Sequence, residues 1–192
     1  MKILDALRLA LLPISLAGLS LPAPAMDMRL PISPLPAGFG HGSPRGITVV
    51  ITSSLEYETR FHERAPTMDF SREWLVYYSP GMVPSTGFEA SIVDVRPGAD
   101  GLSLNIITGL VEPGPNCDVK PVRSHPFALA SFPRPVRTAD SVLFSHLRIV
   151  GDCADPAANR RSLRRLAMLL LHPAPAAPAF TAHKTSAHGI TL

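Results

Sequence analysis

The side chains best suited to chemistry in this sequence are seven histidines, two cysteines and fifteen acidic residues. His62-Glu63 lies near the end of a predicted helix, but the second histidine that a zinc peptidase carries one turn further along is missing. His125 and His146 can approach each other only if their strands are neighbours. The sequence also contains neither a Gly-x-Ser-x-Gly elbow nor a lysine-containing phosphate loop. We therefore expect no enzyme activity, no bound metal and no cofactor.

The two cysteines, Cys117 and Cys153, are far apart in the chain, and their spacing fits neither a zinc site nor a thioredoxin motif. In an oxidising compartment two such residues most simply pair with each other. The alternative is two unpaired thiols whose backbones lie too far apart to be joined. We predict the disulfide, which would close a loop of about 37 residues.

The N-terminus has the pattern of a secretory signal. Lys2 and Arg8 precede the apolar run 9–21, which is too short to span a bilayer as a stable helix. Ala23-Pro24-Ala25 then places small residues at the two positions that a signal peptidase reads. We predict a signal peptide over residues 1–25 and an exported chain that is periplasmic, bound to the cell surface or extracellular. The alternative is an apolar helix that is retained and packs on the domain.

Proline and charge organise the rest of the chain. Prolines cluster at 22–44 and 173–178, where they disrupt regular structure. We therefore expect a lead-in with little structure at 26–45 and a disordered tail at 173–192. The formal net charge is only +3 and much of the basic excess is local, so no nucleic-acid partner is predicted.

Residues 46–153 are expected to form one domain with a mainly β fold. Short runs of β-branched and aromatic residues alternate with proline and glycine turns. The alternation changes parity at Val93, which indicates a bulge or a strand buried on both faces. Strands are predicted at 46–52, 73–78, 88–95, 102–110, 126–132 and 142–149. The resulting mainly antiparallel sheet must curl or pair, as a sandwich or barrel-like domain, to cover its apolar face.

Two helices accompany these strands. Ser53-Ser54-Leu55-Glu56 is a capping box that predicts a short helix, with Leu55 and Phe61 facing inward. Asp155-Pro156 predicts the start of a second helix within residues 154–172. At 3.6 residues per turn this helix is amphipathic. Its apolar side holds Leu163, Leu166, Ala167 and Leu170, and its basic side holds Arg160, Arg161, Arg164 and Arg165. Docking on the sheet is favoured over contact with a membrane surface or an acidic partner.

A family resemblance covers Ile47 to Pro135 and extends toward Cys153. Its motifs, in chain order, are Asp69-Phe70-Ser71, then Gly81 with the turn Pro84-Ser85-Thr86-Gly87-Phe88, then Pro113-Gly-Pro-Asn-Cys117, His125-Pro126-Phe127 and Phe132-Pro133. Together they resemble the PrcB-like domain. Similar proteins are exported bacterial proteins, and the name-giving member is an accessory subunit of a surface protease complex rather than its peptidase. The resemblance implies a non-catalytic module with a protein partner.

The family turn usually reads Pro-Thr-Gly-Gly-Tyr, so Thr86 takes the place of a glycine, which can alter the backbone of the loop, and Phe88 that of a tyrosine. The same departure makes Pro84 to Phe88 similar to the Asn-Pro-Thr-Thr-Gly-Tyr loop of chagasin-type cysteine-protease inhibitors, with Val83 in place of the asparagine. That resemblance implies an inhibitor whose rigid loop lies across a protease cleft. The simpler interpretation is a tight turn between strands. We rank a protein-binding accessory module first, an inhibitor second and an enzyme third.

Overall fold

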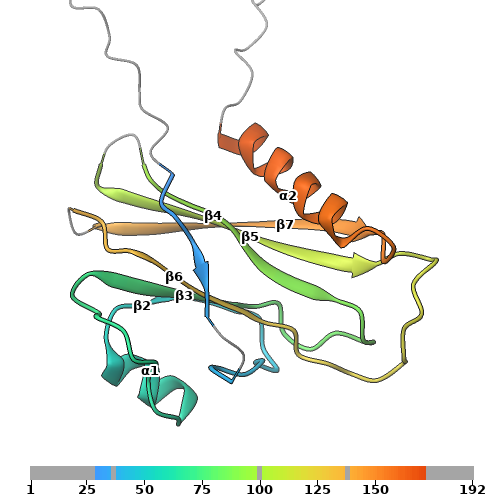
Figure 1. The fold of residues 1–192 in the computed structure, drawn as a ribbon, viewed down its shortest axis with the longest axis horizontal. Helices are drawn as coiled ribbons and strands as arrows, with labels where there is room; N and C mark the ends of the chain where they lie inside the picture. The colour runs from blue at the N-terminus through green and yellow to red at the C-terminus, as the bar shows by residue number, and fades with distance from the viewer. Residues whose placement is uncertain (1–28, 36–37, 99–100, 137–138, 172–192) are drawn as a thin grey trace, which may run out of the picture.

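The computed structural model describes residues 29–35, 38–98, 101–136 and 139–171, and Figure 1 shows their arrangement. The predicted signal peptide, the predicted tail and the tip of the turn at 99–100 lie outside the described residues. The strands are β1 (Ser33–Pro34), β2 (Ile47–Ile51), β3 (Glu73–Ser79), β4 (Glu89–Pro97), β5 (Ser103–Pro113), β6 (Ala128–Pro133) and β7 (Ser141–Gly151). The helices are α1 (Ser54–Phe61) and α2 (Pro156–Leu171).

The elements form four layers, in the order α1, first sheet, second sheet, α2 (Figure 1). The first sheet has the strand order β1-β6-β3-β2, and all its neighbours are antiparallel. The second sheet has the order β4-β5-β7. The predicted mainly β fold is confirmed, and the two sheets form a sandwich rather than a closed barrel.

In the second sheet, β5 and β7 run parallel, unlike every other strand pair. The chain leaves β5, crosses to the first sheet as β6 and then returns as β7, so it reverses direction twice. β7 can therefore begin at the same end of the sheet as β5. The prediction of a mainly antiparallel arrangement is confirmed, and this parallel pair arises because β6, which follows β5 in the chain, belongs to the other sheet.

The predicted irregularity in β4 is a bulge. The register passes from Ile92 opposite Thr108 to Asp94 opposite Ile107, which leaves Val93 as the extra residue. Because of this insertion, Ile92 faces the first sheet while Val93 faces α2. The bulge thus lets one strand supply apolar side chains to both of its faces.

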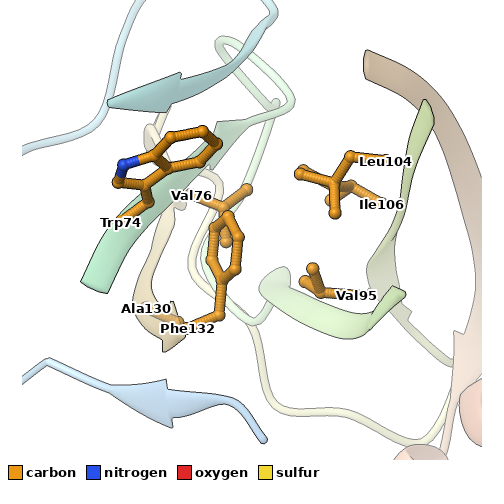
Figure 2. Packing of buried hydrophobic residues seen from close by; sticks show 7 residues of the cluster. All are labelled: Trp74, Val76, Val95, Leu104, Ile106, Ala130 and Phe132. Carbon is orange, nitrogen blue, oxygen red and sulfur yellow. The ribbon is translucent and has the colours of Figure 1, made fainter. Parts of the chain in front are cut away.

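The main core lies between the two sheets, and Figure 2 shows its side chains. The first sheet contributes Trp74 and Phe132, whose rings meet edge-on with centroids 6.4 Å apart. The second sheet contributes Val95, Leu104 and Ile106, all fully buried. Removing these large side chains from water is the main contribution to the stability of the sandwich.

Helix α1 covers the outer face of the first sheet. Ser53 caps its first turn by accepting from the Glu56 amide at 3.2 Å. Its buried side chains are Tyr57 and Phe61, one turn apart, which pack in a cluster with β2, β3 and β6. Leu55, which was expected to face inward, is 71% exposed. Only one line of side chains on such a short helix can touch the sheet, and the aromatic pair occupies it.

Helix α2 docks on the outer face of the second sheet, as the sequence predicted. Leu163 and Ala167 are buried there against a cluster from all three strands. The expected wider apolar face was wrong, because Leu166 and Leu170 are 38% and 54% exposed. The third buried residue is instead Asn159, whose side chain bonds the backbone of Asp152 at 2.9 and 3.0 Å. These two bonds fix the start of the helix on the end of β7.

The lead-in has more structure than its proline content predicted. The Leu30 amide donates to Val95 of the second sheet at 2.9 Å, and the Leu35 amide donates to Leu129 of the first sheet at 3.1 Å. Between them, β1 pairs with β6. The segment therefore crosses one open side of the sandwich from sheet to sheet. Its hydrogen-bond partners lie far away in the chain, so no local pattern could reveal them.

The close approach of α2 to β5 generates a prediction about Gly109. A Cβ at this position would lie 2.7 Å from Leu163 Cδ1 and 2.9 Å from Val93 Cγ2, so an added methyl group would force these buried side chains to shift. We expect Gly109→Ala to lower the free energy of unfolding by about 1–3 kcal/mol through overpacking. Leu163→Ala should cost about 2–5 kcal/mol through the cavity that it leaves.

The double variant separates packing from backbone effects. Because Leu163→Ala removes two of the three atoms that the new methyl group would crowd and leaves only Val93 Cγ2, the two changes together should cost less than the sum of the single changes. Urea unfolding of the four proteins measures this coupling. Additive losses would contradict direct contact between the two sites.

Candidate functional site

The predicted loop Pro84 to Phe88 lies where the chain passes from β3 in the first sheet to β4 in the second. Just before it, Val83 and Ser124 form an isolated antiparallel bridge with N–O distances of 2.9 and 3.1 Å. Gly81 adopts a φ of +95°, and a Cβ there would lie 2.9 Å from the Gly46 amide. Gly81 is therefore required both by backbone conformation and by space.

Side-chain and backbone hydrogen bonds hold the loop against the segment that precedes β6. The Thr86 amide donates to the Lys120 carbonyl at 3.1 Å, and the Lys120 amide donates to Thr86 Oγ1 at 2.9 Å. Ser124 Oγ donates to the Ser85 carbonyl at 2.9 Å. The loop is thus a fixed crossover between sheets rather than a tight turn within one sheet.

The exposed edge of this loop consists of Pro84 and Gly87, with Thr86 and Phe88 half-buried. Gly87 has a φ of +89°, and a Cβ on it would lie 2.7 Å from Val119. In the described part of the chain only His62 has a positive φ among non-glycine residues. Thr86 therefore has an unstrained backbone conformation, and the predicted loop residues lie together.

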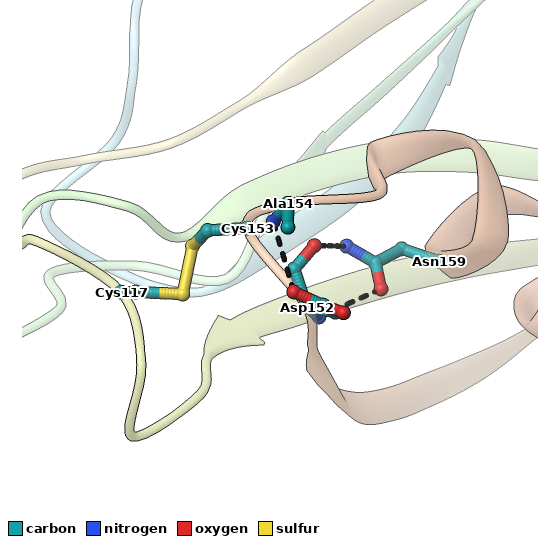
Figure 3. The surroundings of a disulfide bond; sticks show 5 residues. All are labelled: Cys117, Asp152, Cys153, Ala154 and Asn159. Carbon is teal, nitrogen blue, oxygen red and sulfur yellow. Dashed lines mark hydrogen bonds between the residues drawn. A yellow bond between two sulfur atoms is a disulfide. The ribbon is translucent and has the colours of Figure 1, made fainter.

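The two cysteines lie at disulfide distance, with Cα atoms 5.5 Å apart, and Figure 3 shows their surroundings. Cys117 belongs to the segment between β5 and β6, and Cys153 lies between β7 and α2. Next to Cys153, the Ala154 amide donates to Asp152 Oδ1 at 2.8 Å. The disulfide would therefore anchor the segment that carries Lys120 and Ser124, and with it the Pro84–Phe88 loop.

His125 and His146 do not form a common site. His125 is exposed ahead of β6 in the first sheet, whereas His146 lies on β7 in the second. His146 Nδ1 lies 2.7 Å from Thr108 Oγ1, and its ring stacks on Tyr78 at a centroid distance of 5.5 Å. Burial raises the pKa of Tyr78, and its hydrogen bond to Thr108 opposes this shift in part. Thr108 is fully buried, whereas His146 is exposed, and the stacking of His146 on Tyr78 joins the second sheet to the first.

The His62-Glu63 pair closes α1. His62 ends the helix in a left-handed conformation, and its amide donates to the Glu58 carbonyl at 2.9 Å. Glu63 accepts from the Tyr57 hydroxyl and from the Gly40 amide, both at 2.5 Å. These two bonds lower the pKa of Glu63. The carboxylate thus ties the lead-in to the helix, and the described residues contain no cluster of three metal-ligating side chains.

A groove of about 940 Å³ opens beside the lead-in, and no sequence pattern indicated it. Its walls come from four separate parts of the chain: the lead-in, β4, the start of β6 and α2. Most of the lining is apolar, and Arg160 and Arg164 contribute positive charge. The sequence indicated only the arginine-rich side of the predicted helix. It did not show that this side lies next to the lead-in, β4 and β6.

Comparison of the chain with protein-family models, with curated proteins and with solved structures found no match in any of the three. Within the described residues, neither helix has the length and apolar character needed to cross a bilayer.

The cysteine geometry generates a prediction for the stability of the protein. Replacing both cysteines, as Cys117→Ser with Cys153→Ser, should lower the free energy of unfolding by about 3–4 kcal/mol, because the unfolded chain gains freedom. Thermal unfolding under oxidising conditions measures the loss, and adding a reductant to the native protein should reproduce it. Alkylation of both thiols in freshly exported, unreduced protein, seen by mass spectrometry, would show that the bond does not form.

Proposed function

We propose that this protein is an exported, non-catalytic protein-binding module that serves as an accessory subunit of an extracytoplasmic protease complex. The observation that carries the proposal is the Pro84–Phe88 loop. Its hydrogen bonds to Lys120 and Ser124 fix it, while Pro84 and Gly87 remain exposed. A loop that is already rigid loses little conformational entropy on binding, so more of its contact energy appears as affinity.

Two further features support export and a binding role. The cysteine pair at disulfide distance fits an oxidising compartment, where such bonds persist. The N-terminal pattern of basic residues, a short apolar run and Ala23-Pro24-Ala25 is that of a secretory signal. The resemblance of the loop and its flanking motifs to the PrcB-like domain supplies the expected kind of partner, a secreted or surface protease.

The second candidate is a chagasin-like inhibitor of cysteine proteases that uses the same loop. It is favoured by the unstrained backbone at Thr86, which lets Pro84-Ser85-Thr86-Gly87-Phe88 keep the inhibitor-like sequence on a β-sandwich. The two functions differ in their effect on a protease. An inhibitor lowers turnover of a papain-like protease in proportion to the amount added, whereas an accessory subunit binds without blocking the active site.

The export part of the proposal predicts a mature chain that begins at Met26. The small residues Ala23 and Ala25 occupy the positions that signal peptidase reads. N-terminal sequencing of the protein from the envelope or culture fluid of its own cell should find this start. Recovery of the chain from the cytosol, still beginning at Met1, would exclude export.

The binding part predicts that partner capture depends on Pro84 and not on another exposed proline nearby. Pro84→Ala should weaken capture of the partner from native envelope or culture fluid by about tenfold, because the rigid exposed edge is lost. Pro121→Ala is the matched control, since Pro121 is also exposed and lies on the neighbouring segment. Quantitative mass spectrometry of co-purifying proteins measures both variants.

Both variants should melt at the wild-type temperature, so any loss reflects the surface rather than the fold. Adding each purified protein to papain then separates an inhibitor from an accessory subunit. Unchanged capture and unchanged protease turnover with Pro84→Ala and with Phe88→Ala would assign the loop a purely structural role.

A further inference from the structure

The β4 strand leaves one edge of the second sheet partly open. β4 has a single strand neighbour, β5, so alternate backbone groups on its other side point away from the sheet. The described part of the lead-in covers the later part of this edge, through the Leu30 amide on the Val95 carbonyl and the Arg29 guanidinium on the Val93 carbonyl, 2.7 Å away. In the part of the chain that the structure describes, residues 89–92 have no backbone partner on this side.

The open part of the edge borders the groove of about 940 Å³ described above. Its apolar lining includes Ile32, Phe39, Ile92, Phe127 and Leu129. Phe127 is 37% exposed, which is high for a large aromatic side chain beside a core strand. The groove therefore combines apolar surface, which favours burial, with a row of backbone groups that favour pairing with a strand.

Two arginines give the groove a positive charge. Arg160 and Arg164 lie four residues apart on α2, hence on one face of the helix, and both line the groove. Among the described residues neither forms an ion pair. Arg29, by contrast, is paired with the buried Asp94 at 2.9 Å. Glu89 is the one acidic residue of the lining, so positive charge remains to be balanced.

We propose that this groove binds an extended, acidic peptide segment of a partner protein. The segment adds a strand beside Glu89–Ile92 of β4 and places apolar side chains in the groove. Its carboxylate groups lie against Arg160 and Arg164, whose guanidinium groups form strong, charge-assisted hydrogen bonds with such acceptors. This site begins at Glu89, directly after the loop, but its lining includes none of the residues 84–88, and it does not depend on the function proposed for the loop.

A strand-forming peptide fits the groove better than the other ligands that arginines bind. An anionic lipid would use the arginines and the apolar lining, but it has no amides to pair with the edge of β4. A small organic acid would leave the apolar length of the groove unfilled. The edge strand, the apolar lining and the uncompensated arginines are used together only by an extended peptide.

The test selects ligands from a phage-displayed library of random linear peptides, with the full mature chain as the target. The selected peptides should combine alternating β-branched residues with aspartate or glutamate. Arg160→Gln together with Arg164→Gln should weaken the selected peptides by about tenfold or more in Kd, because the charge-assisted bonds are lost. The matched control is Arg161→Gln with Arg165→Gln, which removes the same charge outside the groove and should leave Kd unchanged.

Chemical changes in the peptide test strand addition itself. N-methylation of single peptide amides should weaken binding at every second position, since only alternate amides face β4. Replacement of the acidic residues by their amides should make the peptide insensitive to the arginine variants. Failure to select any peptide, equal losses with both arginine pairs, or no periodic effect of N-methylation would overturn the proposal. Binding of anionic vesicles that depends on Arg160 and Arg164, with no selected peptide, would assign the groove to lipid instead.

The two surfaces are tested independently. Pro84→Ala should leave peptide binding in the groove unchanged, and the Arg160 and Arg164 variants should leave the loop intact. Unchanged partner capture with Pro84→Ala would reject the loop, and unchanged peptide Kd with the Arg160 and Arg164 variants would reject the groove, so either surface can be rejected while the other is retained.

Discussion

The whole arrangement depends on β5 being covered on both faces. Its inner face packs against the first sheet through Leu104 and Ile106, and its outer face packs against α2 through Ile107. A strand buried in this way needs neighbours on both edges and cover on both sides, since any exposed backbone or apolar surface there would cost free energy. β4 and β7 pair with the two edges of β5. Helix α2 covers its outer face.

Other local features follow from the same requirement. The missing side chain at Gly109 leaves room for Leu163 of α2, and the bulge at Val93 turns the Val93 side chain toward the helix. Asn159 is buried at the end of β7, where its two hydrogen bonds replace those that the backbone of Asp152 would otherwise make with water. The helix is therefore held by a narrow contact, which explains why several of its leucines remain exposed.

The edges of the sandwich are treated differently. On one side the lead-in joins both sheets, through one hydrogen bond to each sheet and the pairing of β1 with β6. Its first described residue, Arg29, forms an ion pair with the buried Asp94, which also pairs with Arg96. Beyond this short cover, no other described backbone segment pairs with the edge of β4, which lies beside apolar side chains and two arginines. Open edges invite pairing with another chain, and a charged helix nearby limits which chains can pair. The loop at the crossover from β3 to β4 differs from this edge, because its own hydrogen bonds hold its conformation before any partner binds.

The sequence by itself determined the elements, because their causes are local. Alternating β-branched residues mark the strands, Ser53 and Asp155 cap the two helices, and the parity change at Val93 marks the bulge. Only the tertiary structure decided the parallel pairing of β5 with β7, the structured lead-in and the groove, since each depends on which distant segments meet. The loop illustrates both cases. Its turn-forming residues Pro84 and Gly87 are recognisable from the sequence. The hydrogen bonds that hold it involve Lys120 and Ser124, which follow two strands later in the chain and could not be identified from the loop sequence.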